Sequence, residues 1–236
     1  MNQDKIAIVL SPITTHPDDL HYAEPLVTLL INAGYKVNII DVLSISKDHK
    51  NIISDVESKI KDIVNCSSFI LCGFALGGAI AQYIAHKFPL MSGLLSISGP
   101  SIMSDRLKRN LISILNEVEK NNIENAILLL ESFVSSSQKS QLPRKNIPEN
   151  STQALDRLKI GFNLIMKLDS KLSLSNINKP TLLIVGENSK LVNLENIFDI
   201  DNTHIEKLII KNAGMRPWVD NPLDFNQTIT NYLKKL

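Results

Sequence analysis

The sequence predicts an α/β protein with a mostly parallel six-stranded sheet and helices on both faces. Short runs of aliphatic and β-branched residues alternate with segments of helical periodicity, and a purely helical stretch interrupts this alternation near the middle of the chain. Strands separated by helices of this length form βαβ units, whose parallel strands are covered on both sides. A third observation is the glycine-rich strand-to-helix turn Gly73-Phe74-Ala75-Leu76-Gly77-Gly78.

The composition fits one domain with a sizeable core and argues against several classes of partner. Hydrophobic residues make up 44% of the 236 residues, which is enough for one domain with an inserted subdomain. A net charge of +1, from 25 basic and 24 acidic residues, gives no electrostatic footprint for nucleic acid. No stretch approaches the about 20 apolar residues of a membrane span, and residues 1–10 lack the apolar length of a signal peptide. Cys66 and Cys72 make no disulfide framework, which favours a reducing, cytoplasmic location.

Four strands are predicted in the first part of the chain, at residues 5–10, 36–42, 69–72 and 93–98. Helices are expected between them, at residues 18–33, 50–64 and 79–86. Gly34 is a natural terminator just after the first of these helices.

Residues 101–174 contain no convincing strand. Helices are predicted at residues 106–118, 123–134 and 153–168, with a polar, proline-containing stretch at 135–150. These could be further helices of the main domain, but their position between two strand-rich halves favours an insertion. The predicted division is a core of residues 1–100 and 175–236 with a helical cap of residues 101–174. Two more strands, at 181–185 and 206–211, and helices at 194–200 and 222–236 complete the core.

The turn at Ala75 has the parts of a nucleophile elbow except the nucleophile. In a G-x-S-x-G elbow, a serine stands at a strained turn between a buried strand and a helix, and glycines let the backbones pass closely. Gly73, Gly77 and Gly78 hold the glycine positions here, and Ala75 stands where the serine would be. A glycine-rich turn could equally cradle a phosphate, so this stretch alone leaves both functions open.

In the order of its elements, the chain resembles the α/β-hydrolase family, particularly its small capped esterases, lyases and carbon–carbon hydrolases. Three stretches carry the resemblance: the elbow at residues 71–80, the strand and turn at 179–187, and Asn212-Ala213-Gly214-Met215 with the helix after it. The resemblance covers essentially the whole chain except an opening hairpin that many members have. It implies an α/β-hydrolase fold with a helical cap.

The resemblance also implies a catalytic triad, and all three of its positions have changed. The nucleophile, acid and histidine positions of the family map to Ala75, Ser189 and Met215. The common His-Gly pair after the first strand is Ser11-Pro12 here, and residues 98–101 offer no substitute carboxylate. Acyl transfer needs a nucleophile, a base and a group that orients the base. An engineered serine-to-alanine change would leave the other two intact, so the triple loss indicates a natural departure.

Two backbone amides of the family's site can remain when the triad side chains are lost. The family's oxyanion hole uses the amide after the nucleophile and one from the loop after the first strand, which map to Leu76 and Ile13. A ligand carbonyl or enolate oxygen could bind there, at a helix N-terminus that favours negative charge. Alternatively, these amides are solvated or covered by side chains. Alanine and methionine at the triad positions make an apolar floor, which suits a hydrophobic ligand or a collapsed core.

Five further residues are candidates for the lining of a pocket: Ser11, His16, Ser98, Arg216 and Trp218. His16 could act as a substitute base oriented by Asp18 or Asp19. Alternatively, Asp18 or Thr15 caps the helix that follows and His16 faces solvent.

Arg216 and Trp218 follow the missing histidine, where they could line the pocket or hold the cap. A tryptophan is as often a packing anchor between cap and core. Neither cysteine has a histidine at a recognisable spacing, so no metal or other cofactor is expected.

Three functions remain open. The first is a pseudoenzyme with the α/β-hydrolase fold that binds a small apolar or carbonyl-bearing molecule under its cap, or serves a protein partner. The second is a lyase, isomerase or cyclase that stabilises an enolate at the amides of Ile13 and Leu76. The third is an esterase with displaced catalytic residues. An ionisable group in the pocket, such as His16 or Arg216, favours an enzyme, whereas a purely apolar lining favours binding.

Overall fold

Six parallel strands form a single sheet, as predicted from the alternation of strands and helices, and the structure orders them β2-β1-β3-β4-β5-β6. The computed structural model describes residues 5–17, 19–46, 49–135, 150–197, 199 and 201–236. The strands are β1 (Lys5–Leu10), β2 (Tyr35–Ile40), β3 (Phe69–Phe74), β4 (Met91–Ile97), β5 (Thr181–Gly186) and β6 (Ile205–Ile210). β3 and β5 are buried at every residue because helices cover both faces of the sheet.

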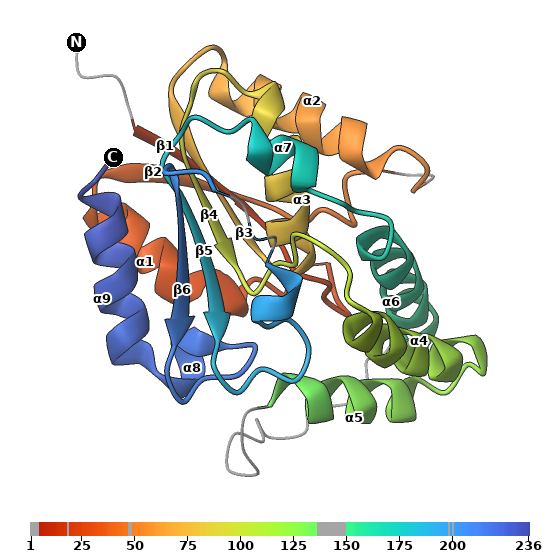
Figure 1. The fold of residues 1–236 in the computed structure, drawn as a ribbon. Coiled ribbons are helices and arrows are strands. Elements are labelled where there is room, and N and C mark those ends of the chain that lie inside the picture. The colour runs from red at the N-terminus through yellow and green to blue at the C-terminus, as the bar shows by residue number, and fades with distance from the viewer. Residues whose placement is uncertain (1–4, 18, 47–48, 136–149, 198, 200) are drawn as a thin grey trace.

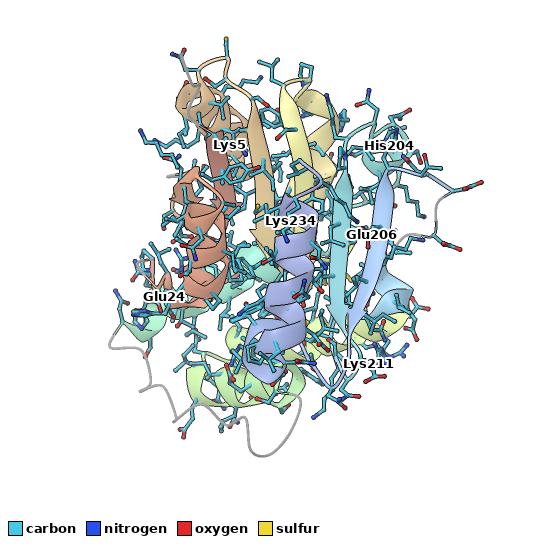
Figure 2. The ribbon with its side chains drawn as sticks, turned by 90° about the vertical axis from the view of Figure 1, so that its left-hand side faces the viewer. Lys5, Glu24, His204, Glu206, Lys211 and Lys234 are labelled. Atoms are coloured by element: carbon cyan, nitrogen blue, oxygen red, sulfur yellow. The ribbon has the colours of Figure 1, made fainter. Side chains whose placement is uncertain are left out.

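Helices α1 (Glu24–Asn32) and α9 (Pro222–Leu233) cover one face, and α2 (Ile52–Val64) and α3 (Leu76–Ile84) cover the other (Figure 1). Each face has its own apolar cluster: Leu26 and Phe225 belong to the first, and Val56 and Ile80 belong to the second. Figure 2 looks onto the face with α1 and α9, where labelled side chains of both charge signs lie around the helices. The sheet is therefore the middle of three layers.

Four helices separate β4 from β5: α4 (Asp105–Glu119), α5 (Ile123–Val134), α6 (Ser151–Ile165) and α7 (Lys171–Ser175). α4 contacts both α5 and α6, and these three helices gather at the lower right of Figure 1. α7 instead packs against α3 and the short 3-10 helix η2 (Ala85–Lys87) of the core. We use the word cap for α4, α5 and α6. Most of the polar stretch expected at 135–150 lies outside the described residues.

Two predicted helices differ most from the structure in extent. The helix expected at 18–33 begins with a 3-10 turn, η1 (His21–Ala23), and α1 itself starts at Glu24, because Pro25 fits the first helical turn. Thr15 consequently lies too far from the helix start to cap it, and Asp18 lies outside the described residues. Gly34, just after α1, has a φ of 85°, as its role as a terminator requires.

The helix expected at 194–200 is only the 3-10 turn η4 (Leu194–Asn196). Asn193 and Asn196 cap each other across this turn, and Ile197 has already returned to an extended conformation. Short turns with polar caps compete with helix extension, which explains the difference. Two short helices were missed: α7 and α8 (Pro217–Asp220). The final helix ends at Leu233, three residues before the predicted end at Leu236.

Close backbone contact joins α3 to the end of β1. A Cβ atom on Gly77 would overlap the carbonyl of Leu10 and lie 2.5 Å from the carbonyl oxygen of Ser11. Gly73 is equally restricted, since a Cβ there would lie 2.6 Å from the backbone nitrogen of Gly78. The first turn of α3 therefore rests directly on the backbone of β1, and the loop after β1 begins beside the elbow.

We predict that Gly77→Ala destabilises the fold by about 3 kcal/mol or more, because the added methyl group meets backbone atoms that cannot rotate away. Gly34→Ala is the matched control: nothing lies within 4 Å of its Cβ position, so it carries only the strain of its φ of 85°, about 1–2 kcal/mol. Urea denaturation followed by circular dichroism measures both. Equal losses in the two variants would contradict the close contact at Gly77.

Candidate active-site region

The chain turns from β3 into α3 at Ala75, which has a φ of 46° and a ψ of −110°. L-amino acids avoid this combination, and residues held there are typical of functional turns. The backbone of Ala75 is fixed on both sides: its N–H donates to the carbonyl of Ile97 (2.9 Å), and its carbonyl accepts from the N–H of Ala79 (2.9 Å). The strained backbone of an elbow is thus present without a nucleophilic side chain.

The backbone N–H groups of Leu76 and Ile13 have no acceptor among the described residues. Leu76 is the first residue of α3, where a helix leaves its N–H groups without intrahelical partners. Ile13 belongs to the loop after β1, which begins beside α3 at Gly77. Neither N–H is therefore used by the rest of the described chain.

The positions predicted for the acid and the histidine, Ser189 and Met215, lie just after β5 and in the loop after β6, and both are buried. The hydroxyl of Ser189 has no hydrogen-bond partner in the described part of the chain. The sulfur of Met215 accepts from the N–H of Val192 (3.4 Å). Neither residue has a side chain that can take up a proton from a nucleophile at neutral pH.

Apolar side chains surround this region. Leu76, Val192 and Met215 belong to the same buried cluster as the cap residues Leu158 and Phe162. The half-buried side chains of Ala75 and Ile13 pack against this cluster. The surroundings of the elbow therefore favour an apolar group over a charged one.

Three of the predicted pocket residues use their polar groups within the protein. Ser98, which has a φ of 52°, donates from its hydroxyl to the carbonyl of Met215 (2.9 Å). The Ser11 hydroxyl accepts from the N–H of Val42 (3.1 Å). Arg216 donates to both carboxylate oxygens of Glu131 on α5, at 2.7 and 3.2 Å. Arg216 therefore ties the loop after β6 to the cap.

His16 and Trp218 have different surroundings. The side chain of His16 is half-buried and has no hydrogen-bond partner among the described residues, although its carbonyl accepts from the Thr14 hydroxyl (2.8 Å). Trp218 makes edge-on contact with Phe74 (4.9 Å between ring centres) and a tilted contact with Phe225 (6.2 Å). Both partners are core residues, so these contacts attach Trp218 to the α1–α9 side and not to the cap.

Tyr22 contacts the other edge of the same aromatic group. Its ring lies 5.3 Å from that of Phe74 in a perpendicular arrangement, and its buried hydroxyl has no partner among the described residues. Burial, followed by the nearby carboxylates of Asp41 and Asp19, raises the pKa of Tyr22 above its ordinary value. The phenol therefore stays neutral and can only donate or accept a hydrogen bond.

A buried ion pair that the sequence reading missed holds the cap to the core. The guanidinium of Arg157 on α6 donates from Nη2 to both carboxylate oxygens of Asp41, at 2.9 and 2.8 Å. It also donates from Nη1 to the Ser44 hydroxyl (3.0 Å), and from Nε and Nη2 to the carbonyl and hydroxyl of Thr14 (2.7 and 2.8 Å). The Arg157 side chain is only 6% exposed.

A signal for this pair did exist in the sequence. Position 157 falls on the apolar face of its helix. Ala154 precedes it by about one turn, Leu158 is next to it and Gly161 follows about one turn later, and all three are buried. An arginine on an apolar face requires a buried partner. The sequence does not reveal which carboxylate supplies it, since Asp41 lies 116 residues away.

Among the described residues, no group of three or more His, Cys, Asp and Glu side chains has the arrangement of a metal site. No helix within the described ranges is both long and apolar enough to cross a membrane. A shallow hollow of about 180 Å³ lies between α1 and the edge strand β2, lined by Leu20, His21, Glu24, Val27 and Ile39.

Solved structures identify the architecture. MGS-M2, an α/β-hydrolase enzyme from a Medee basin deep-sea metagenome library, superposes with a TM-score of 0.78 over 100% of this chain and 91% of its own, at 17% sequence identity. The chain has the α/β-hydrolase fold. This α/β-hydrolase fold is shared with MenH from S. aureus (TM-score 0.70, 19% identity, 100% and 95% coverage). The esterase EaEST from Exiguobacterium antarcticum has a TM-score of 0.71, 14% identity, and 98% and 92% coverage. No protein-family model matches the sequence, and no curated protein matches it either.

We predict that Arg157→Met lowers the free energy of unfolding by about 3–5 kcal/mol, because it leaves the carboxylate of Asp41 buried without a cation. Arg216→Met removes a more exposed pair of the same kind, whose loss costs about 1 kcal/mol or less. Urea denaturation of both variants provides the comparison. The double variant Asp41→Asn/Arg157→Met should regain part of the loss, and equal losses in the two single variants would show that burial of the Arg157 pair does not matter.

Proposed function

We propose that this protein is a non-hydrolytic member of its fold that binds a small apolar, carbonyl-bearing molecule beneath the cap. In this proposal, the carbonyl oxygen accepts hydrogen bonds from the amides of Leu76 and Ile13. The apolar part of the ligand contacts the side chains around Met215. The ligand is an uncharged or weakly polar compound, because the apolar surroundings disfavour a strongly hydrated group.

One observation carries the proposal: the elbow keeps its strained backbone and two unpaired amides while its side chains are inert. A φ of 46° at Ala75 costs free energy, which the fold tolerates when the turn has a use. Donors fixed in a largely apolar site bind a ligand oxygen more strongly than the same donors in water. A binding role uses both features and needs no nucleophile.

Ester hydrolysis through a displaced triad has less support. Serine hydrolysis needs a base within hydrogen-bond reach of the nucleophile. Ser11 and Ser98 are hydrogen-bonded within the protein, and Ser189 is buried. At 14–19% identity, similar structures share only the fold with this chain, so the esterase activity of some of them gives this chain no mechanism.

A second candidate function, an enzyme that stabilises an enolate without covalent catalysis, is favoured by one observation. His16 lies in the loop that carries Ile13, and its half-buried side chain is not hydrogen-bonded within the described residues. Histidine is the side chain that most often serves as a general base. Arg216, the other ionisable group considered for this role, is paired with Glu131. If a candidate substrate is turned over by the wild type and not by His16→Gln, this result would support the enzymatic function.

We predict that 2-hexanone, an apolar ketone, binds at the elbow. In a titration followed by two-dimensional NMR, the amide protons of Leu76 and Ile13 should shift downfield, because each gains an acceptor. The control ligand 1-hexene has a similar shape without the oxygen and should move methyl signals near Met215 but not these amide protons. The proposal fails if 2-hexanone leaves both amides unchanged, or if the ketone and the alkene act alike.

We further predict that the wild-type protein is not labelled by a fluorophosphonate and that hydrolysis can be restored. The triple variant Ala75→Ser/Ser189→Asp/Met215→His should hydrolyse p-nitrophenyl acetate at least about 100-fold faster than Ala75→Ser alone, because a serine gains from a base only when both are present. Stoichiometric labelling of the wild type would overturn the non-hydrolytic proposal. An inactive but folded triple variant would leave the correspondence of these three positions to a triad unsupported.

A further inference from the structure

The cap helix α6 touches the loop that carries the amide of Ile13 at two consecutive residues. Arg157 donates to both the carbonyl and the hydroxyl of Thr14, at 2.7 and 2.8 Å. One turn further along α6, a Cβ atom on Gly161 would lie only 2.6 Å from Cγ1 of Ile13. The Ile13 side chain therefore packs against the bare backbone of α6, and its neighbour is hydrogen-bonded to the same helix.

Asp41 closes this arrangement from the core. Its carboxylate accepts from Arg157 and also from the N–H of Leu43 (3.2 Å) and the hydroxyl of Ser44 (2.7 Å). The Ser11 hydroxyl, at the start of the Ile13 loop, lies 3.4 Å from the same carboxylate. The loop is thus held at Ser11 through Asp41 and at Thr14 through Arg157, with Ile13 between the two attachments.

An arginine is needed for this geometry. Its guanidinium is a rigid fork with five donors, which here meets a carboxylate, two hydroxyls and a carbonyl at once. A lysine can keep the charge beside Asp41 but cannot also donate along the fixed directions toward Thr14. The position of the loop consequently depends on the shape of the Arg157 side chain and not on its charge alone.

We propose that Arg157 is a positioning residue that sets the orientation of the Ile13 amide, so that the cap forms part of the ligand site. This inference rests on the proposed binding at Ile13 and Leu76 for its functional meaning. The Leu76 amide needs no such support, because the first turn of α3 is fixed by the backbone of β1 and β3. The two donors are therefore held by different parts of the protein: Leu76 by the core, and Ile13 by the cap.

The test compares Arg157→Lys with the wild type by methyl and amide NMR. In the wild type, the δ1 methyl group of Ile13 should show a nuclear Overhauser effect to the α protons of Gly161. In Arg157→Lys this effect should fall at least 5-fold, while the amide signals of β3 and α9 stay in place. Affinity for 2-hexanone should fall at least 5-fold as well, and the ketone should still shift the Leu76 amide.

Two further variants separate positioning from general weakening of the cap. Arg216→Lys perturbs another ion pair between cap and core, which does not involve the Ile13 loop, and it should preserve the contact of Ile13 with Gly161. Thr14→Val removes one acceptor of Arg157 and keeps the Asp41 pair, so it should weaken that contact even if Arg157→Lys fails to fold.

Three outcomes decide the proposal. An unchanged contact of Ile13 with Gly161 in Arg157→Lys or Thr14→Val overturns it, as does an equal loss in Arg216→Lys. The proposal is supported if the contact is lost in Arg157→Lys and kept in Arg216→Lys. If the contact behaves as expected but the wild type does not bind 2-hexanone, Arg157 positions the loop and the proposed ligand class is wrong.

Discussion

The whole arrangement depends on how closely the backbone of α3 approaches the backbone of β1. Gly77 permits this approach, since any side chain there would overlap the carbonyl of Leu10. The contact fixes the first turn of α3, and the hydrogen bond from Ala75 to Ile97 fixes the turn before it. None of these forces involves the side chain of Ala75. The elbow can therefore lose its nucleophile and keep its shape, and the Leu76 amide stays in place with it.

A buried polar network connects α3 to the segment after β4, where the chain enters the cap. The amide of Gln82 on α3 donates to the Ser96 hydroxyl (2.8 Å) and the Gly99 carbonyl (2.9 Å), and its oxygen accepts from the Ser101 hydroxyl (2.6 Å). All of these side chains are buried, so an unpaired member would carry a desolvation cost. The segment where the chain leaves β4 for the cap is thereby attached to the elbow helix.

The sequence was sufficient to predict the sheet, the turn at Ala75 and the run of helices between β4 and β5, because each depends on local patterns of apolar residues and glycines. It was not sufficient for features decided by distant partners. The start of α1 moved to Glu24 and the turn at Asn193 replaced a longer helix, since capping and proline geometry outweighed apolar periodicity. The position of Arg157 on an apolar helix face indicated only that this side chain needs a buried partner. Asp41 and Thr14 become its partners through the packing of α6 on the loop after β1.

Charged groups in this region hold the cap, whereas the positions expected to carry out chemistry are neutral. Two of the ion pairs that attach the cap to the core differ in exposure. The side chains of Arg157 and Asp41 are 6% and 11% exposed, and those of Arg216 and Glu131 are 26% and 39% exposed. Water screens and replaces the second pair more readily, so separating it costs less free energy. The Arg157 pair on α6, beside the Ile13 loop, is therefore a stronger attachment of the cap to the core than the Arg216 pair on α5.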